Sequence, residues 1–278
     1  MTGAQTIEVR GDQPRSLIVT VYGLYAREVG GWLSIASLIR LLAGLGVDEA
    51  SVRSSISRLK RRGVLEAQRA DGVAGYALSK LGRALLNEGD LRIFGRTTGT
   101  VSDGWVVAVF SVPESERGRR HLLRSQLAWL GFGTVSAGVW VAPSHRYAQA
   151  RSSIEELGLA GYVDLFRSDY LGFADLRSAV ASWWDIEGLQ TLYEDFTRAH
   201  TPMLTSWRKR RKVDSGLAFA DYVRALTQWR RLPYLDPGLP AELLPSPWHG
   251  ARATEVFLGL QDLLRGAAAS HVRDVTSP

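Results

Sequence analysis

GVDEASVRSSISRLKRR, at residues 46–62, has the pattern of an amphipathic helix. Asp48 can cap that helix, because its side chain can accept a hydrogen bond from a backbone N–H of the first turn. Helical spacing then places Val52, Ile56 and Leu59 on one side. Small hydroxyl residues and arginines lie on the opposite side. Such a surface suits the major groove of DNA, where hydroxyls and guanidinium groups can meet phosphates and guanine edges.

The polar side of this predicted helix supplies candidate DNA contacts. The residues expected to contact bases or phosphates are Arg53, Ser54, Ser57, Arg58 and Arg61. Those expected to contact the phosphate backbone are Lys60, Arg62 and, in the segment that follows, Arg69. A basic helix that is merely solvated is the alternative interpretation when this segment is considered alone.

The flanking segments predict a winged helix-turn-helix over residues 14–95. A proline suits the first turn of the first helix, and Ser34 can cap a second helix. After Gly63 the apolar period becomes two around an Asp71–Gly72 turn, which is typical of a hairpin. Three helices followed by a hairpin have the order of a winged helix, preceded here by a loose arm at residues 1–13.

The rest of the chain predicts two further domains. Residues 96–103 have the composition of a linker. Residues 104–168 predict the order βαββαβ, which forms an antiparallel ferredoxin-like sheet, and such a sheet can pair with a second copy. Residues 169–278 are predicted to form a helical domain rich in aromatic side chains. The expected fold class is therefore α+β, with several domains.

Composition and charge restrict the class of protein. The chain has 278 residues, of which 45% are hydrophobic, and no cysteine, so disulfides and cysteine metal sites are excluded and a cytoplasmic location is expected. No long apolar run predicts export or membrane insertion. The net charge is +6, and residues 1–99 hold 14 basic against 9 acidic residues, a net charge of +5. This excess is expected if the N-terminal third meets a polyanion.

Five phrases occur in order between residues 14 and 270. They are PRSLIVTVYGLY, LIRLLAGLGVDEASVRSSISRLKRRGVLE, WVVAVFSVPE, LRSQLAWLGFGTVSAGVWVAP and RRLPYLDPGLPAELLPSPWHG. Their combination resembles the PaaX-like family, the repressors of phenylacetic acid degradation operons. The resemblance implies a homodimeric transcriptional repressor with a central Cas2-like domain. It also implies release from the operator by an aryl-acyl-CoA such as phenylacetyl-CoA, with no bound cofactor.

An effector of that kind needs an apolar slot for its aryl group and cations for its phosphates. The predicted third domain contains both residue types. The candidates are Trp183, Trp184, Tyr193, Trp207, Arg208, Trp229, Arg230, Arg231 and Trp248. Ordinary aromatic packing in a helical core is the alternative for each of them. The basic run at residues 208–212 could instead contact DNA that flanks the operator.

A Cas2-like metal-dependent nuclease is the alternative from a different functional class. Nucleases of the Cas2 type place an aspartate at the end of the first strand, where paired carboxylates can hold a metal ion. Here that strand ends near Ser111, a poor metal ligand, and Glu114 lies beyond a proline. We therefore predict a regulator without enzyme activity that binds an inverted-repeat operator in double-stranded DNA. A ligand-independent architectural DNA-binding protein is a third possibility.

Overall fold

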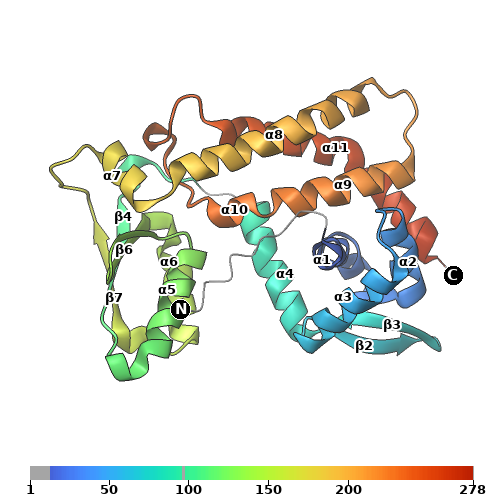
Figure 1. Cartoon of the computed structure of the whole chain (residues 1–278), viewed down its shortest axis with the longest axis horizontal. Helices are drawn as coiled ribbons and strands as arrows, with labels where there is room; N and C mark the ends of the chain where they lie inside the picture. Colours follow the sequence, from blue (N-terminus) through green and yellow to red (C-terminus); the bar gives the residue numbers. More distant parts are fainter. Residues whose placement is uncertain (1–12, 96–97, 278) are drawn as a thin grey trace. The chain divides into compact units, whose positions relative to one another are not determined.

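The computed structural model describes residues 13–95 and 98–277, and it divides into two compact units (Figure 1). The first unit comprises Met1–Leu91, Phe196–Arg230 and Arg252–Pro278. The second comprises Arg92–Asp195 and Arg231–Ala251. The residues expected to form a separate helical domain, 169–278, therefore contribute to both units. Residues 1–12 of the predicted arm lie outside the described residues. Residues 96 and 97 of the predicted linker also lie outside them.

Three helices and a small antiparallel sheet form the N-terminal part of the first unit. The helices are α1 (Pro14–Leu24), α2 (Ile35–Ala43) and α3 (Glu49–Arg61), with a short 3-10 turn at Ala26–Val29 after α1. The strands are β1 (Trp32–Ser34), β2 (Leu65–Ala70) and β3 (Val73–Leu78), in the spatial order β1-β3-β2. The three helices and the hairpin thus occur in the predicted order, and β1 is an additional strand.

Local capping explains where these helices begin. The Oδ1 atom of Asp48 accepts a hydrogen bond from the backbone N–H of Ser51 at 2.8 Å, and the Ser34 side chain accepts one from Ser37 at 3.0 Å. The hairpin turn is also as predicted: Asp71 and Gly72 both have positive φ, at 51° and 78°. Two such residues in succession suit the twist of a two-residue hairpin.

Four longer helices contribute to the first unit. Helix α4 (Lys80–Ile93) follows the hairpin. The others are the C-terminal part of α8 (Ile186–Lys209), then α9 (Ser215–Trp229) and most of α11 (His249–Thr276). Helix α1 contacts both α3 and α9 (Figure 1). Buried hydroxyls of Thr20 and Thr227 lie 2.7 Å apart at the second of these contacts, so α9 belongs to the core of this unit.

The second unit contains the predicted βαββαβ order. Its elements are β4 (Trp105–Phe110), α5 (Arg117–Trp129), β5 (Gly133–Ser136), β6 (Val139–Pro143), α6 (Tyr147–Glu156) and β7 (Val163–Ser168). The strands pair antiparallel in the order β5-β6-β4-β7. Residues Val101–Asp103, inside the predicted linker, form a short 3-10 turn before the sheet.

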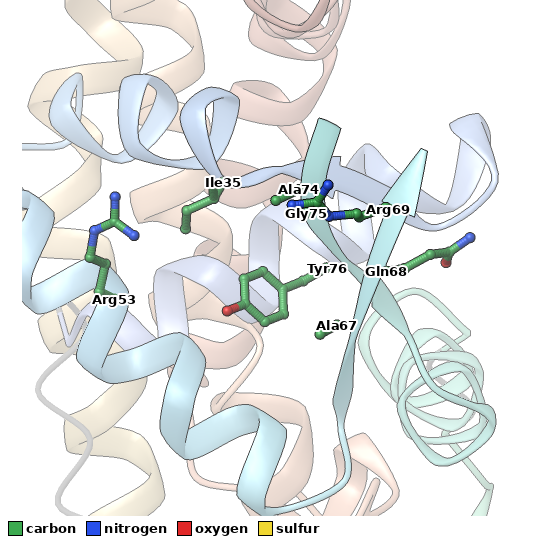
Figure 2. A pocket seen from close by; sticks show the side chains of 8 residues that line it. All are labelled: Ile35, Arg53, Ala67, Gln68, Arg69, Ala74, Gly75 and Tyr76. Atoms are coloured by element: carbon green, nitrogen blue, oxygen red, sulfur yellow. The ribbon is translucent and has the colours of Figure 1, made fainter. Parts of the chain in front are cut away.

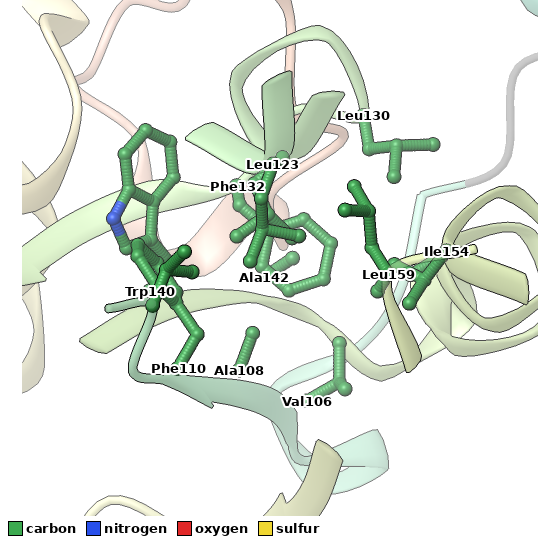
Figure 3. Close-up of a cluster of buried hydrophobic side chains, with 13 residues drawn as sticks. Val106, Ala108, Phe110, Leu123, Leu130, Phe132, Trp140, Ala142, Ile154 and Leu159 are labelled. Atoms are coloured by element: carbon green, nitrogen blue, oxygen red, sulfur yellow. The ribbon is translucent and has the colours of Figure 1, made fainter. Parts of the chain in front are cut away.

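Both faces of this sheet are partly covered. Side chains such as Ala108 pack against α5 and α6 through Leu123 and Ile154 (Figure 3). The opposite face is covered at one end by α7 (Leu176–Trp183) and by the segment after α10 (Leu232–Leu235). Every helix among the described residues is too short or too polar to span a membrane.

Candidate nucleic-acid interface

Helix α3 presents two chemically different faces. Its inner face is buried at Val52, Ile56 and Leu59, whose exposed fractions are 0%, 1% and 3%, as the helical spacing predicts. Ser55 completes this buried face. The polar side of the helix is consequently turned away from the core of the unit.

All of the predicted DNA contacts are exposed to solvent. They are Arg53, Ser54, Ser57, Arg58, Lys60, Arg61, Arg62 and, on β2, Arg69. The structure thus brings seven of them together on α3 and the residue that caps its end, with Arg69 on the adjoining hairpin. Lysine and arginine in the last turn of a helix are also favoured by the negative end of its dipole.

Most of these cations lack a partner among the described residues. Arg53 is the exception, because its Nε and Nη2 atoms both lie 2.7 Å from the Oε1 atom of Glu49. The other cations form no side-chain hydrogen bond or salt bridge within the part of the chain that the structure describes. They are Arg58, Lys60, Arg61, Arg62 and Arg69. Their charges are therefore available to an external anion.

A pocket of about 320 Å³ lies between α3 and the hairpin (Figure 2). Arg53 lines one side and Arg69 the other, with the ring of Tyr76 between them. The remaining lining residues are Ile35, Ala67, Gln68, Ala74 and Gly75. Sequence reasoning missed this pocket because it depends on how α3 packs beside the sheet. The alternation of small and polar residues in the hairpin was the available signal.

The effector candidates do not gather in one compact unit. Trp207, Arg208, Trp229 and Arg230 lie in the first unit, whereas Trp183, Trp184, Tyr193, Arg231 and Trp248 lie in the second. Several of these aromatic side chains form part of a core. Trp229 is 1% exposed and stacks on Phe257 with ring centroids 4.7 Å apart, and Trp207 donates to the carboxylate of Asp221 at 2.8 Å.

In the second unit, the candidates fall into two aromatic clusters. Trp183 and Trp184 pack around Trp105, with ring centroids about 6 Å from it, and the Trp184 indole N–H donates to a backbone carbonyl at 3.0 Å. Tyr193 is fully buried; its hydroxyl donates to Asp236 at 2.6 Å, and its ring meets Trp248 edge to face. These contacts explain why the DPGLP and SPWHG phrases fold against α8.

Arg208 differs from these buried aromatic residues. It is exposed, as are the other cations of the basic run at residues 208–212. Within this run, the guanidinium of Arg210 stacks on the Trp207 ring at 4.4 Å. The positive charge of the run is therefore concentrated at the surface, at the end of α8.

The strand end considered for a nuclease metal site has different local chemistry. Ser111 is exposed beyond β4, and the Glu114 carboxylate forms an ion pair with Arg120 at 2.9 Å. Among the described residues, His, Asp and Glu side chains do not form a group of three that could hold a metal ion.

One histidine has an unusual environment that spacing did not indicate. The pKa of His145 is lowered to about 4, chiefly by burial and also by the nearby charge of Arg146, whereas Asp103 acts in the opposite direction. Neither ring nitrogen has a hydrogen-bond partner among the described residues. His145 is therefore neutral in the folded protein near neutral pH.

Comparisons with known proteins agree with this architecture. Residues 13–82 match the family described as PaaX-like protein, residues 98–180 match the PaaX protein central Cas2-like domain, and residues 184–274 match the PaaX-like protein C-terminal domain. The transcriptional repressor PaaX of Escherichia coli (strain K12) is 27% identical over 263 residues, which cover 93% of this chain and 83% of that protein.

A solved structure has a similar fold. The uncharacterized protein Rv0674 from Mycobacterium tuberculosis matches 95% of this chain and 99% of its own, with a TM-score of 0.58 and 23% sequence identity. At that identity the likeness concerns the fold alone. The three consecutive family matches together span most of the chain, from residue 13 to residue 274. The protein belongs to the PaaX-like family.

Proposed function

We propose that this protein is a transcriptional repressor that binds double-stranded DNA through a winged helix-turn-helix formed by α1–α3 and β1–β3. The observation that carries the proposal is the outer face of α3, where the exposed cations other than Arg53 have no partner among the described residues. In helix-turn-helix proteins, one helix enters the major groove and a dimer reads two half-sites. The likeness to a named transcriptional repressor supports the same role. Such a protein acts on DNA in the cytoplasm.

A homodimer would explain an uncovered part of the four-stranded sheet. Val107 on β4 pairs with Phe166 on β7, so the two side chains share a face with Val109. Phe166 and Val109 are 53% and 39% exposed. A second copy would remove this apolar surface from water. Two-fold symmetry in the protein would then match an inverted-repeat operator.

The proposed effector is an aryl-acyl-CoA such as phenylacetyl-CoA. The exposed cations around Arg208 have the charge needed to bind its phosphates. Repression ends if the thioester binds more tightly to a conformer whose two winged helices are wrongly spaced for the half-sites. Each ligand then lowers the affinity for the other.

Fluorescence anisotropy with DNA from the region upstream of its own gene tests this function. We expect tight binding that a scrambled sequence lacks and that the double variant Arg58→Ala/Arg61→Ala abolishes. Phenylacetyl-CoA should weaken the binding of the wild-type protein. Equal affinity for both sequences would indicate an architectural protein instead. Unchanged operator affinity at saturating thioester would reject this effector, and Mg²⁺-dependent cutting of the probe would reject the non-enzymatic assignment.

A further inference from the structure

Glu49 is the one acidic side chain in α3, and it lies on the exposed side of the proposed DNA-binding helix. An acidic residue in the first turn is stabilised by the positive end of the helix dipole. It would also repel an approaching phosphate. The side chain is 56% exposed, so neither burial nor a role in the core explains its position.

The partner of Glu49 is a candidate DNA contact. Arg53 is 58% exposed and directs its Nε and Nη2 atoms to the same carboxylate oxygen, Oε1. Exposed pairs four residues apart on a helix stabilise a protein only weakly, because water screens the charges and both side chains lose freedom. A phosphate could therefore replace the carboxylate at little cost to the stability of α3.

Arg53 also forms one wall of the pocket beside the hairpin, and Arg69 forms the other (Figure 2). The surface between them is lined by Ile35, Ala67 and the ring of Tyr76, so cations flank an apolar floor. This arrangement matches the chemistry of a sugar–phosphate backbone, in which apolar sugar faces alternate with anionic groups. Helix and hairpin residues commonly make such backbone contacts.

The shape of the pocket depends on β1. A Cβ atom at Gly75 would lie 2.5 Å from the Leu33 carbonyl oxygen and 2.6 Å from the Trp32 ring, so only glycine allows this close approach. The Trp32 indole N–H donates to the Gln68 carbonyl at 3.2 Å. These contacts hold β1, β3 and β2 together, and they place Arg69 opposite Arg53 before any ligand arrives.

We propose that the pocket between α3 and the hairpin binds one segment of DNA sugar–phosphate backbone, and that Glu49 limits the affinity by competing with the phosphate for Arg53. This inference rests on the proposed DNA-binding function and adds a ligand subsite and an affinity-limiting residue to it. It makes Glu49 a negative determinant, because removing its charge frees Arg53 for DNA.

The test measures DNA affinity at several salt concentrations for wild-type protein and Glu49→Gln. We expect Glu49→Gln to bind both operator and random-sequence DNA about 3–10-fold more tightly at low salt, since one repulsive charge is lost. The slope of log affinity against log salt should become steeper by about one, because one more cation contacts phosphate. In an Arg53→Ala background, Glu49→Gln should no longer produce the steeper slope.

A matched control is available on α6. Arg151 and Glu155 form a pair of the same spacing, with a distance of 3.0 Å and similar exposure. Glu155→Gln changes the net charge by the same amount as Glu49→Gln. Because Glu155 lies outside α3 and the hairpin, this change should leave DNA affinity and the salt slope unchanged. If Glu155→Gln raises affinity as much as Glu49→Gln does, the effect is one of total charge and the inference is wrong.

The remaining outcomes separate this inference from the proposed function. Weaker binding of Glu49→Gln to the operator alone would show that Glu49 reads a base, and unchanged affinity and slope would show that it does not limit binding. Either result would overturn the inference and leave DNA binding intact. If wild-type protein binds no DNA at all, the proposed function and the inference are both wrong.

Discussion

Helices α3 and α5 resemble each other in sequence pattern. Each has 13 residues and four cations, and each buries an aliphatic stripe. The stripe of α3 faces α1, α2 and β2, and that of α5 faces the four-stranded sheet. By charge alone, α5 is as good a candidate for a nucleic-acid contact as α3. The two helices differ in what surrounds their cations.

Three of the four arginines in α5 have internal partners. Arg119 pairs with Glu116 at 3.1 Å and donates to the Tyr162 hydroxyl at 2.7 Å, and Arg120 pairs with Glu114. Arg124 lies over the Trp140 ring. In α3, by contrast, Arg53 alone has such a partner among the described residues. A cation that lacks a partner within the protein can bind an external anion, whereas a paired cation stabilises the fold. This difference, and not the number of cations, distinguishes a binding surface.

The largest effects should come from the inner faces, where the two helices are alike. Leu59→Ala in α3 and Leu127→Ala in α5 each remove a side chain that is at most 3% exposed. Each change should lower the free energy of unfolding by about 2–5 kcal/mol, because it leaves a cavity. Urea unfolding followed by circular dichroism measures this. If Leu59→Ala lowers the free energy of unfolding by less than about 1 kcal/mol, the packing of α3 is contradicted.

The outer faces should respond differently. Arg58→Ala should weaken operator binding by about 1–3 kcal/mol if its guanidinium contacts a base, whereas a phosphate contact would weaken all sequences alike. Arg119→Ala is the matched control in α5 and should leave operator affinity unchanged. Anisotropy titrations on operator and scrambled DNA make the comparison. If both variants lose the same amount of operator affinity, the absence of internal partners for the α3 cations is not what distinguishes the helices.

Local signals in the sequence account for much of this fold. The caps at Asp48 and Ser34, the buried stripe of α3 and the Asp71–Gly72 turn each depend on a few neighbouring residues, and all are confirmed. The exposed positions of the candidate DNA contacts follow from the same helical period. Sequence periodicity is reliable where one face of an element is buried and the other is not.

Features that depend on tertiary packing could not be predicted. Strand β1 has three residues, which are too few to establish a period. The division of the C-terminal helices between two units depends on contacts such as that between Thr20 and Thr227, which are 207 residues apart. The effector candidates are likewise divided between the two units. Residue type indicates what a side chain can bind, but it does not indicate which side chains are its neighbours.

A smaller, pH-dependent effect should distinguish the unit that contains α5. The unfolded chain protonates His145 near its ordinary pKa of 6.5, whereas the folded protein does so only near 4. Stability should therefore fall as pH decreases from 6.5 to about 4, because the unfolded state binds the proton first. His145→Gln should show a shallower loss in urea unfolding over this range. An identical pH dependence would show that His145 is not buried in its neutral form.

The smallest effect concerns the ion pairs themselves. Arg120→Ala in α5 removes the pair with Glu114 and a hydrogen bond to the Val112 carbonyl, so it should lower the free energy of unfolding by up to about 1 kcal/mol. Arg61→Ala in α3 removes no such contact among the described residues and should leave stability unchanged or slightly higher, since alanine favours helices. Thermal unfolding at low and high salt makes the comparison. Salt should reduce the difference between the variants, because it screens the pair in α5.

A larger loss of stability for Arg61→Ala than for Arg120→Ala would mean that the cations of α3 stabilise the fold. The contrast between the two helices would then be lost.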